Sequence, residues 1–276
     1  MRFGPFRLVL GVLVVAITTA SAASQCRYEL TVIEHYCQPD DTSPTVPTAI
    51  NDNGDVCGFV TICTVGDQFP FVWTEADGLQ LLLGPPGTKS GKAYGIHNDG
   101  RIVGEINISG PSAARAFVYD AGQWTMLDPV FPDGPAQSSA RAIDDDGTIV
   151  GRRGIVEDSH SPWNAFIWHE CDGFTDLGVM NGPRSEAAAI SNGRAVGSTG
   201  ASAAGDNAFI HDSGQTTVLD PIPGGSKSAA QAVNASGAVC GGGRLPVDGE
   251  LPTCCSRAFV WSSGVYEVLE PLADEE

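Results

Sequence analysis

The chain has 276 residues, of which 42% are hydrophobic and 17% are charged, and it contains 34 glycines and 18 prolines. This composition is too apolar for a disordered chain, and the length suffices for one sizeable core, which excludes a small disulfide-held knot. The formal charge of −18 argues against a nucleic-acid binder or a protein held at anionic membranes, because both need clustered lysine and arginine. A basic partner, a cation or a neutral sugar remains compatible with this charge.

The first 22 residues have the three-part pattern of a secretory signal peptide. Arg2 and Arg7 precede an apolar run from Leu8 to Ile17, and the small residues Ala20-Ser21-Ala22 end the segment. The apolar run is too short to span a membrane, for which a helix needs roughly 20 residues. We therefore expect residues 1–22 to be removed on export. The mature chain, starting at Ala23 with no membrane span, would be secreted to the periplasm or the extracellular space.

A β-strand is expected at residues 28–34, directly before the repeated part of the chain. The segment Tyr28–Glu34 is similar to the last strand of each repeat described below. Strands from the two chain ends commonly complete one blade of a closed ring. We therefore expect this strand to share a blade with the C-terminal strands, with a surplus strand at a sheet edge or outside the sheets.

A sequence block recurs five times in the mature chain, which we expect to form a single domain over residues 23–276. Each copy pairs a small-Ile-x-x-x-Gly-x-Val-Val-Gly stretch, such as Ala49–Gly58, with an Ala-Phe-Val-Trp stretch. The cores of the five copies lie near residues 47–83, 93–127, 140–178, 187–219 and 230–270. The structural positions that define the repeat are the glycines Gly58, Gly104, Gly151, Gly197 and Gly241 and the phenylalanines Phe71, Phe117, Phe166, Phe209 and Phe259.

Each repeat is expected to supply four antiparallel β-strands. Its segments are short, β-branched or aromatic, and bounded by Gly, Asn, Asp or Pro, and no apolar stripe has helical spacing. In the third strand Phe71 and Trp73 share one face while Val72 takes the other, so both faces are apolar and must be covered. Four-stranded sheets that are buried on both faces and repeated five times predict an all-β, five-bladed β-propeller. An open stack of β-repeats is the alternative.

These motifs resemble the HAF family of extracellular repeat proteins, which are secreted bacterial proteins named for a His-Ala-Phe motif. The resemblance covers roughly residues 28–271. It implies a secreted, β-propeller-like repeat protein and no established activity. The histidine of the family motif is replaced in every copy, so no role of its imidazole is carried over; the replacements are Phe69, Arg115, Asn164, Asn207 and Arg257.

All eight cysteines lie in the mature chain, and export makes disulfides the default interpretation. Strand direction places Cys37 and Cys63 at the same end of the first repeat, which makes a bond between them geometrically sensible. Cys57 and Cys240 hold equivalent places in the first and last repeats, which a closed ring would make neighbours, so we expect cysteines to lock the seam. The disulfide candidates are Cys26, Cys37, Cys57, Cys63, Cys171, Cys240, Cys254 and Cys255.

No metal site and no cofactor are predicted. Asn51–Asp55 and Asp144–Gly147 resemble calcium loops, in which carboxylates at alternate positions surround the cation. Their first ligand positions would fall on Ala49 and Ala142, so we expect hairpin turns instead, with structural calcium as the alternative.

No catalytic residue is predicted either. His211-Asp212-Ser213 contains the residue types of a hydrolase triad, but neighbours in a strand point to opposite faces of the sheet. His211 occupies the aromatic position of the third strand, so packing is its expected role. The chain has no Gly-x-Ser-x-Gly elbow and no histidine pair at metal-ligand spacing.

Loop lengths indicate where a ligand would bind. The connections between the second and third strands, and those between repeats, vary in length and emerge on one rim, whereas the hairpin turns of the other rim are nearly constant. We therefore expect binding on the variable rim, at Arg152–Trp163 and Gly242–Ser256, or at the axial mouth. The expected function is that of a monomeric, non-catalytic binding or scaffold protein for an unknown extracellular ligand, a carbohydrate or a surface protein. The alternative is a propeller glycosidase or lyase with acidic residues at the axial mouth.

Overall fold

The computed structural model describes residues 31–33, 44–62, 66–108, 114–127, 137–154, 163–201, 205–244 and 256–269. Packing divides the chain into two units, Met1–Val32 and Ile33–Glu276, and all strands described below belong to the second. The expected signal peptide lies outside the described residues.

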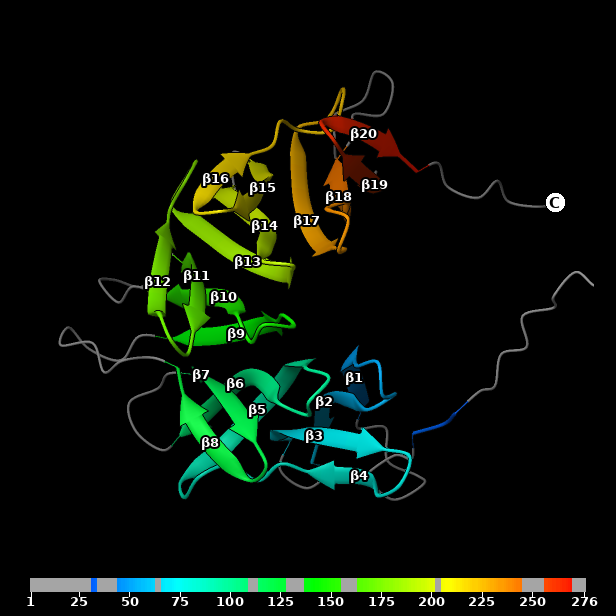
Figure 1. Cartoon of the computed structure of the whole chain (residues 1–276), viewed down its shortest axis with the longest axis vertical. Coiled ribbons are helices and arrows are strands. Elements are labelled where there is room, and N and C mark those ends of the chain that lie inside the picture. The colour runs from blue at the N-terminus through cyan, green and yellow to red at the C-terminus, as the bar shows by residue number, and fades with distance from the viewer. Residues whose placement is uncertain are drawn as a thin grey trace, which may run out of the picture. The chain divides into compact units, whose positions relative to one another are not determined.

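In the described residues, β-strands form five antiparallel sheets, numbered here in chain order (Figure 1). Sheet 1 contains β1 (Thr45–Ile50), β2 (Val56–Thr61), β3 (Gln68–Thr74) and β4 (Gly78–Leu81). Sheet 2 contains β5 (Thr88–Ile96), β6 (Ile102–Ile108), β7 (Ala114–Asp120) and β8 (Gln123–Met126). Sheet 3 contains β9 (Ser138–Ile143), β10 (Ile149–Gly154), β11 (Trp163–His169) and β12 (Gly173–Gly178). Sheet 4 contains β13 (Arg184–Ser191), β14 (Arg194–Ala201), β15 (Gly205–Asp212) and β16 (Gln215–Val218). Sheet 5 contains β17 (Lys227–Val233), β18 (Val239–Arg244), β19 (Ser256–Ser262) and β20 (Val265–Val268).

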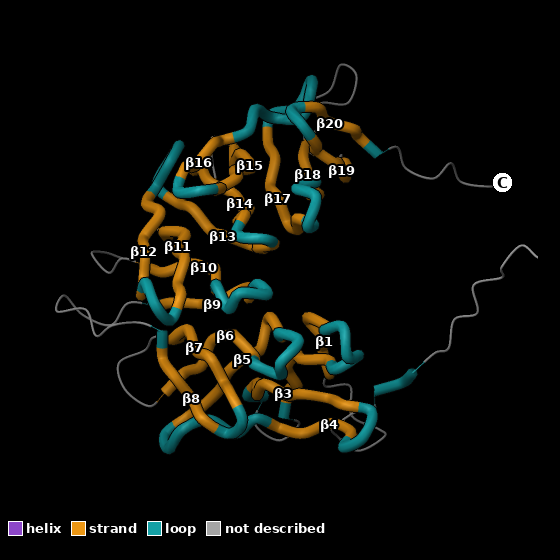
Figure 2. Tube along the Cα trace, in the orientation of Figure 1, coloured by secondary structure: helices purple, strands orange, loops and turns teal. Residues whose placement is uncertain are grey.

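The prediction of an all-β, five-bladed β-propeller with four-stranded antiparallel blades is confirmed. Each sheet arises from one repeat, and its four strands pair in chain order. The described part of the chain contains strands and loops only (Figure 2), so it has no helix that could cross a membrane. The first strand of each sheet after the first packs against the first three strands of the sheet before it. Extensive contacts of this kind are found between consecutive sheets. Among the described strands, no such contact connects sheet 1 with sheet 5.

The strand expected at residues 28–34 falls mostly outside the described residues. The three residues of this range that are described, Thr31–Ile33, form no strand. Ile33 packs against the buried side chains of Val60 and Phe71 in sheet 1. Every described sheet consists of four consecutive strands, so none of them combines strands from both ends of the chain.

A β-bulge interrupts the first strand of every sheet at the same place. One residue of the first strand has no partner in the second strand, and the pairing shifts by one position there. Such a bulge bends the strand and turns the side chain of the extra residue to a new direction. The five extra residues are Thr48, Tyr94, Arg141, Ala188 and Gln231.

The repeated glycine of the second strand lies directly beside this bulge. Gly151, for example, pairs with Ala140 of β9 on one side and with Phe166 of β11 on the other. A Cβ atom on Gly151 would overlap the carbonyl oxygen of Ser139, and the other four repeat glycines meet the equivalent oxygen of their own first strand. The glycine is therefore required by the close approach of a strand within the same sheet.

The core consists of apolar layers between consecutive sheets. The repeat phenylalanine that pairs with each glycine is at most 1% exposed, and in sheets 2 to 5 it packs in the layer toward the preceding sheet. The opposite face of sheets 1 to 4 presents valine, cysteine and alanine to the following sheet. Phe259 and Val239 of sheet 5, for example, pack against Val196 and Ala208 of sheet 4.

The structure does not show the expected locking of the seam by Cys57 and Cys240, since both are free thiols in it. Cys57 is fully buried in the layer between sheets 1 and 2, whereas Cys240 is exposed on the face of sheet 5 that points away from sheet 4. Equivalent residues of two blades point the same way around a propeller, so they do not face each other. Cys171 is a free, exposed thiol in the β11–β12 turn. The other five candidates, Cys26, Cys37, Cys63, Cys254 and Cys255, lie outside the described residues.

Candidate functional site

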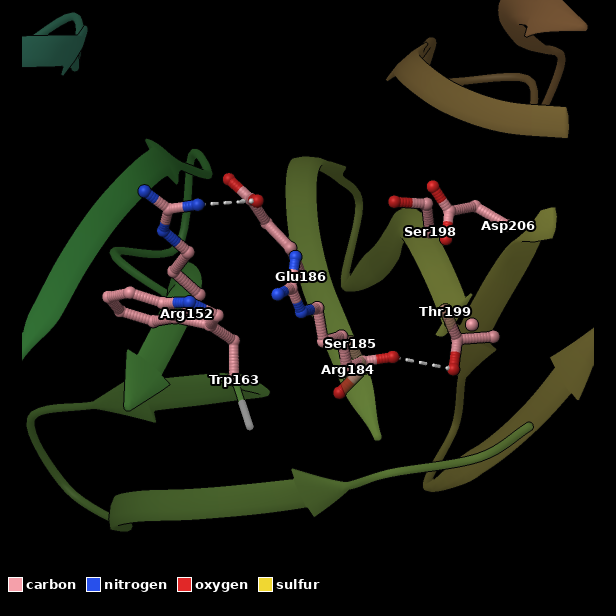
Figure 3. Close-up of a pocket in the computed structure, with 9 residues that line it drawn as sticks. Arg152, Trp163, Arg184, Ser185, Glu186, Ser198, Thr199 and Asp206 are labelled. Atoms are coloured by element: carbon pink, nitrogen blue, oxygen red, sulfur yellow. Dashed lines mark hydrogen bonds and ion pairs between the residues drawn. The ribbon is translucent and has the colours of Figure 1, made fainter. Parts of the chain in front are cut away.

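A hollow of about 170 Å³ lies between sheets 3 and 4, at the rim from which the loops of variable length emerge (Figure 3). Two of its residues, Arg152 and Trp163, flank the β10–β11 connection, which was one of the two loops expected to bind a ligand. Residues 155–162 of that connection, and residues 245–255 of the other loop, lie outside the described residues. The lining consists of Arg152, Trp163, Arg184, Ser185, Glu186, Ser198, Thr199, Gly200 and Asp206.

The register of sheet 4 places four of these side chains on one face. Arg184 of β13 pairs with Gly200 of β14, which in turn pairs with Asp206 of β15. Two residues further along β13, Glu186 pairs with Ser198. Directly paired residues project on the same side of a sheet, and so do residues at i and i+2 of one strand. The side chains of Arg184, Glu186, Ser198 and Asp206 therefore project from the same face.

Glu186 occupies the middle of the hollow and is held by two arginines of sheet 3. Its Oε1 accepts a hydrogen bond from Arg141 Nε at 2.8 Å, and its Oε2 accepts one from Arg152 Nη1 at 3.0 Å. Arg141 is the extra residue of the β9 bulge, so the bulge is what turns its guanidinium toward sheet 4. Both carboxylate oxygens of Glu186 are thus engaged in joining the two sheets.

Aromatic rings extend this polar chain on both sides. The guanidinium of Arg152 lies 4.4 Å from the ring centroid of Trp163, and that of Arg141 lies 4.4 Å from the ring centroid of Tyr94. Tyr94, the extra residue of the β5 bulge, donates its hydroxyl to Glu105 at 2.9 Å. Burial and the negative charge of Glu105 raise the pKa of Tyr94 well above its ordinary value, so it stays a neutral donor.

The two remaining hydroxyl groups of the hollow are used to hold strands. Ser185 is 1% exposed; its hydroxyl accepts a hydrogen bond from the amide of Ala165 at 2.8 Å and donates one to the carbonyl of Gly178 at 2.5 Å. Thr199 donates to the carbonyl of Arg184 at 3.0 Å, as Figure 3 shows. These hydroxyls fix the positions of β11 and β13, and they are not free for a ligand.

A second, larger hollow of about 460 Å³ lies on the axis at the opposite rim, where the short turns lie. All five sheets contribute to it, through an apolar residue at or next to the end of each first strand. This ring consists of Ile50, Ile96, Ile143, Ile190 and Val233, and polar side chains of the adjoining turns surround it.

The acidic and amide groups of the axial hollow connect the turns of successive sheets. Asp144 is 6% exposed, and its carboxylate accepts hydrogen bonds from the amides of Asn192 and Gly193 at 3.1 and 2.6 Å. Asp52 accepts a hydrogen bond from the side-chain amide of Asn98 at 2.8 Å. The polar groups that surround the axis therefore have a structural role in joining one turn to the next.

The two calcium-like stretches form the turns β1–β2 and β9–β10. In the first, the side-chain oxygen of Asn51 accepts hydrogen bonds from the amides of Asn53 and Asp55 at 3.0 and 2.9 Å. Within the described residues no three His, Cys, Asp or Glu side chains are grouped so that they could hold a metal ion.

The sequence His211-Asp212-Ser213 does not assemble into a triad. The Nδ1 atom of His211 lies 2.7 Å from the hydroxyl of Thr216, and Asp212 accepts hydrogen bonds from Arg194 at 2.6 and 3.0 Å. Burial lowers the pKa of His211, and the neighbouring charge of Asp212 opposes this shift only in part. His211 is therefore a neutral side chain bonded to its neighbouring strand.

The sequence did not indicate the residues that line the smaller hollow, apart from Arg152 and Trp163 at the two ends of the loop. Their polar side chains are not at repeat positions, and only the strand register and the bulge bring Arg141, Arg184, Glu186 and Asp206 together. The sequence did contain a signal for one group: Ser138, Ser185 and Ser228 each lie five positions before the isoleucine or valine of their repeat.

No family model matches the chain, and no curated protein matches it. Solved structures do match the chain. TolB from Acinetobacter baumannii aligns over 80% of this chain and 52% of its own at 10% identity and a TM-score of 0.51. A puromycin hydrolase mutant complexed with PGG aligns over 82% of this chain and 38% of its own at 14% identity and a TM-score of 0.54. The chain thus spans about half of the TolB chain and less of the hydrolase, and at these identities the likeness concerns the fold.

Proposed function

We propose that the protein is an exported, monomeric β-propeller that binds an extracellular ligand without transforming it, or scaffolds other molecules. The observation that carries this proposal is that each hollow contains an acidic residue held by fixed hydrogen-bond donors. Glu186 is held by two arginines, and Asp144 is held by two backbone amides. A carboxylate bound in this way by fixed donors is stabilised as an anion and is a poor general acid or base.

The rim hollow is the proposed binding site, because it combines ionic and hydroxyl groups with an aromatic ring on a rigid scaffold. Carbohydrates and surface proteins are the two ligand classes that the sequence suggested for such a site. A place among the HAF extracellular repeat proteins also stays part of the proposal, supported by the repeat itself.

Binding and catalysis can be separated by one experiment on the mature chain, residues 23–276. A glycan array would detect binding, and mass spectrometry of the soluble oligosaccharides after incubation would detect cleavage. We expect any bound sugar to be recovered unchanged. A new reducing end or an unsaturated product would overturn the non-catalytic function if it disappeared in Asp145→Asn, whose side chain lines the axial hollow.

Export is tested independently of ligand binding. The full chain, produced in a bacterial host, is expected in the periplasmic fraction or the medium with Ala23 as its first residue. N-terminal sequencing of the purified protein checks this, and a cytoplasmic product that retains residues 1–22 would contradict it.

A further inference from the structure

Two opposite charges in the rim hollow have no partner within the described part of the chain. The guanidinium of Arg184 and the carboxylate of Asp206 both line the hollow, and neither makes an ion pair or a side-chain hydrogen bond there. Their neighbours Glu186 and Arg152, by contrast, are paired with each other at 3.0 Å. The hollow therefore contains one engaged ion pair and one available charge of each sign.

A glycine separates the two available charges. Arg184 and Asp206 are the cross-strand partners of Gly200 on its two sides, so they project from one face with a strand between them. Strands in a sheet lie roughly 4.8 Å apart, which puts the two Cα atoms about 10 Å from each other. Gly200 has a φ of 150°, which other residues rarely adopt, so the position between the charges carries no side chain.

The remaining free polar group lies beside this gap. Ser198 is next to the Gly200 position on the same face, and its hydroxyl makes no hydrogen bond to described residues. Figure 3 shows Ser198 and Asp206 together on one side of Glu186, with Arg152 and Trp163 on the other. Three groups are thus available to a ligand. The guanidinium of Arg184 can bind a carboxylate, the carboxylate of Asp206 can bind an ammonium group, and Ser198 offers a hydroxyl.

We propose that this hollow binds a small zwitterion of the amino-acid class, with its carboxylate on Arg184 and its ammonium group on Asp206. This inference rests on the proposed function, because it names the ligand of the binding module. Arginine forms paired, charge-assisted hydrogen bonds with a carboxylate, and aspartate accepts them from an ammonium group. The hollow of about 170 Å³ is well below the roughly 300–1,000 Å³ of drug-sized pockets, so it suits a single small molecule.

The test uses the mature chain and three probes: an equimolar mixture of the twenty common L-amino acids, glucose and N-acetylglucosamine. Saturation-transfer NMR at millimolar concentration is expected to show contact with one or more amino acids. Isothermal calorimetry then gives the affinity of the strongest binder. Absence of any amino-acid contact by folded protein would overturn the inference.

Four variants test whether the charges of Arg184 and Asp206 bind the ligand. Arg184→Gln and Asp206→Asn should each weaken binding at least about tenfold, because each removes a hydrogen bond to a charged group. Arg244→Gln, at an exposed residue that ends β18, and Asp172→Asn, whose side chain is 85% exposed in the β11–β12 turn, are the matched controls and should bind as the unmodified chain does. Equal affinity in all variants would place the ligand elsewhere and overturn the inference.

Ligands in which one charged group is chemically blocked test which residue binds which end of the ligand. The N-acetylated form of the strongest binder lacks the ammonium group, so it should bind more weakly and be insensitive to Asp206→Asn. The carboxamide form should be insensitive to Arg184→Gln in the same way.

The outcomes also separate this inference from the proposed function. Binding of a sugar and of no amino acid would overturn the inference that the ligand is a zwitterion, and the proposed binding function would stand. Chemical conversion of a bound amino acid in the NMR sample would overturn the proposal that the protein is non-catalytic, and the inference that its ligand is an amino acid would stand.

Discussion

Gly151 lies between the backbone of β9 and a buried ring of β11. An added Cβ would overlap the carbonyl oxygen of Ser139 and stand 2.9 Å from Cε1 of the buried Phe166 ring. We therefore expect Gly151→Ala to lower the free energy of unfolding by about 3 kcal/mol or more, since backbone and core would both have to shift. Urea unfolding followed by circular dichroism measures this loss.

Gly54→Ala is the matched control for that substitution. Gly54 has a φ of 84° in the β1–β2 turn, and no atom lies within 4 Å of its added Cβ. We expect only backbone strain, which would lower the free energy of unfolding by about 1 kcal/mol. Equal losses for the two variants would show that the bulged strand can yield, contrary to the explanation given for the repeat glycine.

The free thiols differ in their surroundings and should differ in reactivity. Burial raises the pKa of Cys57 from 9.0 to about 11, against hydrogen bonds from Thr48 and the backbone that lower it, whereas Cys171 and Cys240 are exposed. Iodoacetamide labelling of the folded protein near pH 8, followed by peptide mass spectrometry, should modify Cys171 and Cys240 and leave Cys57 intact until the protein is unfolded. Rapid labelling of Cys57 in folded protein would contradict its position in the layer between sheets 1 and 2.

The same pKa shift predicts a pH dependence. The folded state keeps the Cys57 proton up to about pH 11, while the unfolded chain releases it above about pH 9. The stability that the protonated thiol contributes is therefore complete below pH 9 and is lost as the pH rises toward 11. A Cys57→Ala variant should lose less unfolding free energy than the unmodified chain over this interval.

At the scale of strands, a buried serine joins each of three sheets to the sheet before it. Ser138, Ser185 and Ser228 are each at most 2% exposed and accept a hydrogen bond from an amide of the preceding sheet at 2.8 to 3.0 Å. Ser185→Ala would leave the amide of Ala165 without its acceptor, so we expect a loss of about 2 kcal/mol in unfolding free energy.

Ser139 provides the matched control in the neighbouring sheet. It is 1% exposed like Ser185, but its hydroxyl has no hydrogen-bond partner among the described residues. Ser139→Ala should therefore be neutral or stabilising, because it removes a buried polar group that makes no bond. Thermal unfolding of the two variants compares them, and a larger loss for Ser139→Ala would refute the role given to the serines.

Hairpin turns are the elements that the sequence predicted best. Asn-Gly and Asp-Gly pairs tolerate the positive φ of a tight turn, and Gly54, Gly100 and Gly147 have φ values of 84°, 94° and 88°. Composition could not reveal that the same turns bond to one another across sheets, as Asp144 does with Gly193, because the acceptor and donor are 49 residues apart.

At the scale of the whole molecule, the last sheet differs from sheets 2 to 4, because only one of its faces is covered by another described sheet. Ala116, Ala165 and Ala208 are fully buried by the sheet that follows, whereas the equivalent Ala258 is exposed, as is Cys240. No described strand of another sheet makes extensive contact with this face of sheet 5.

Hydrogen exchange should reflect this difference between sheets. Amides of β18 and β19 are expected to exchange faster than those of β10 and β11 in sheet 3, which has a sheet on each side. Exchange followed by mass spectrometry of peptides measures both regions in one sample. Equal protection would mean that the exposed face of sheet 5 is covered in solution.

The sequence by itself determined the repeat, the strand class, the turns and the number of blades. These features depend on local periodicity and on residues such as Gly54 and Phe71, whose positions recur in every copy. The tertiary structure alone decided the bulges, the direction in which Cys57 and Cys240 point, and the meeting of Arg184 with Asp206 across Gly200. The physical reason is that a one-residue shift in pairing turns a side chain to the other face of a sheet, and composition carries no record of such a shift.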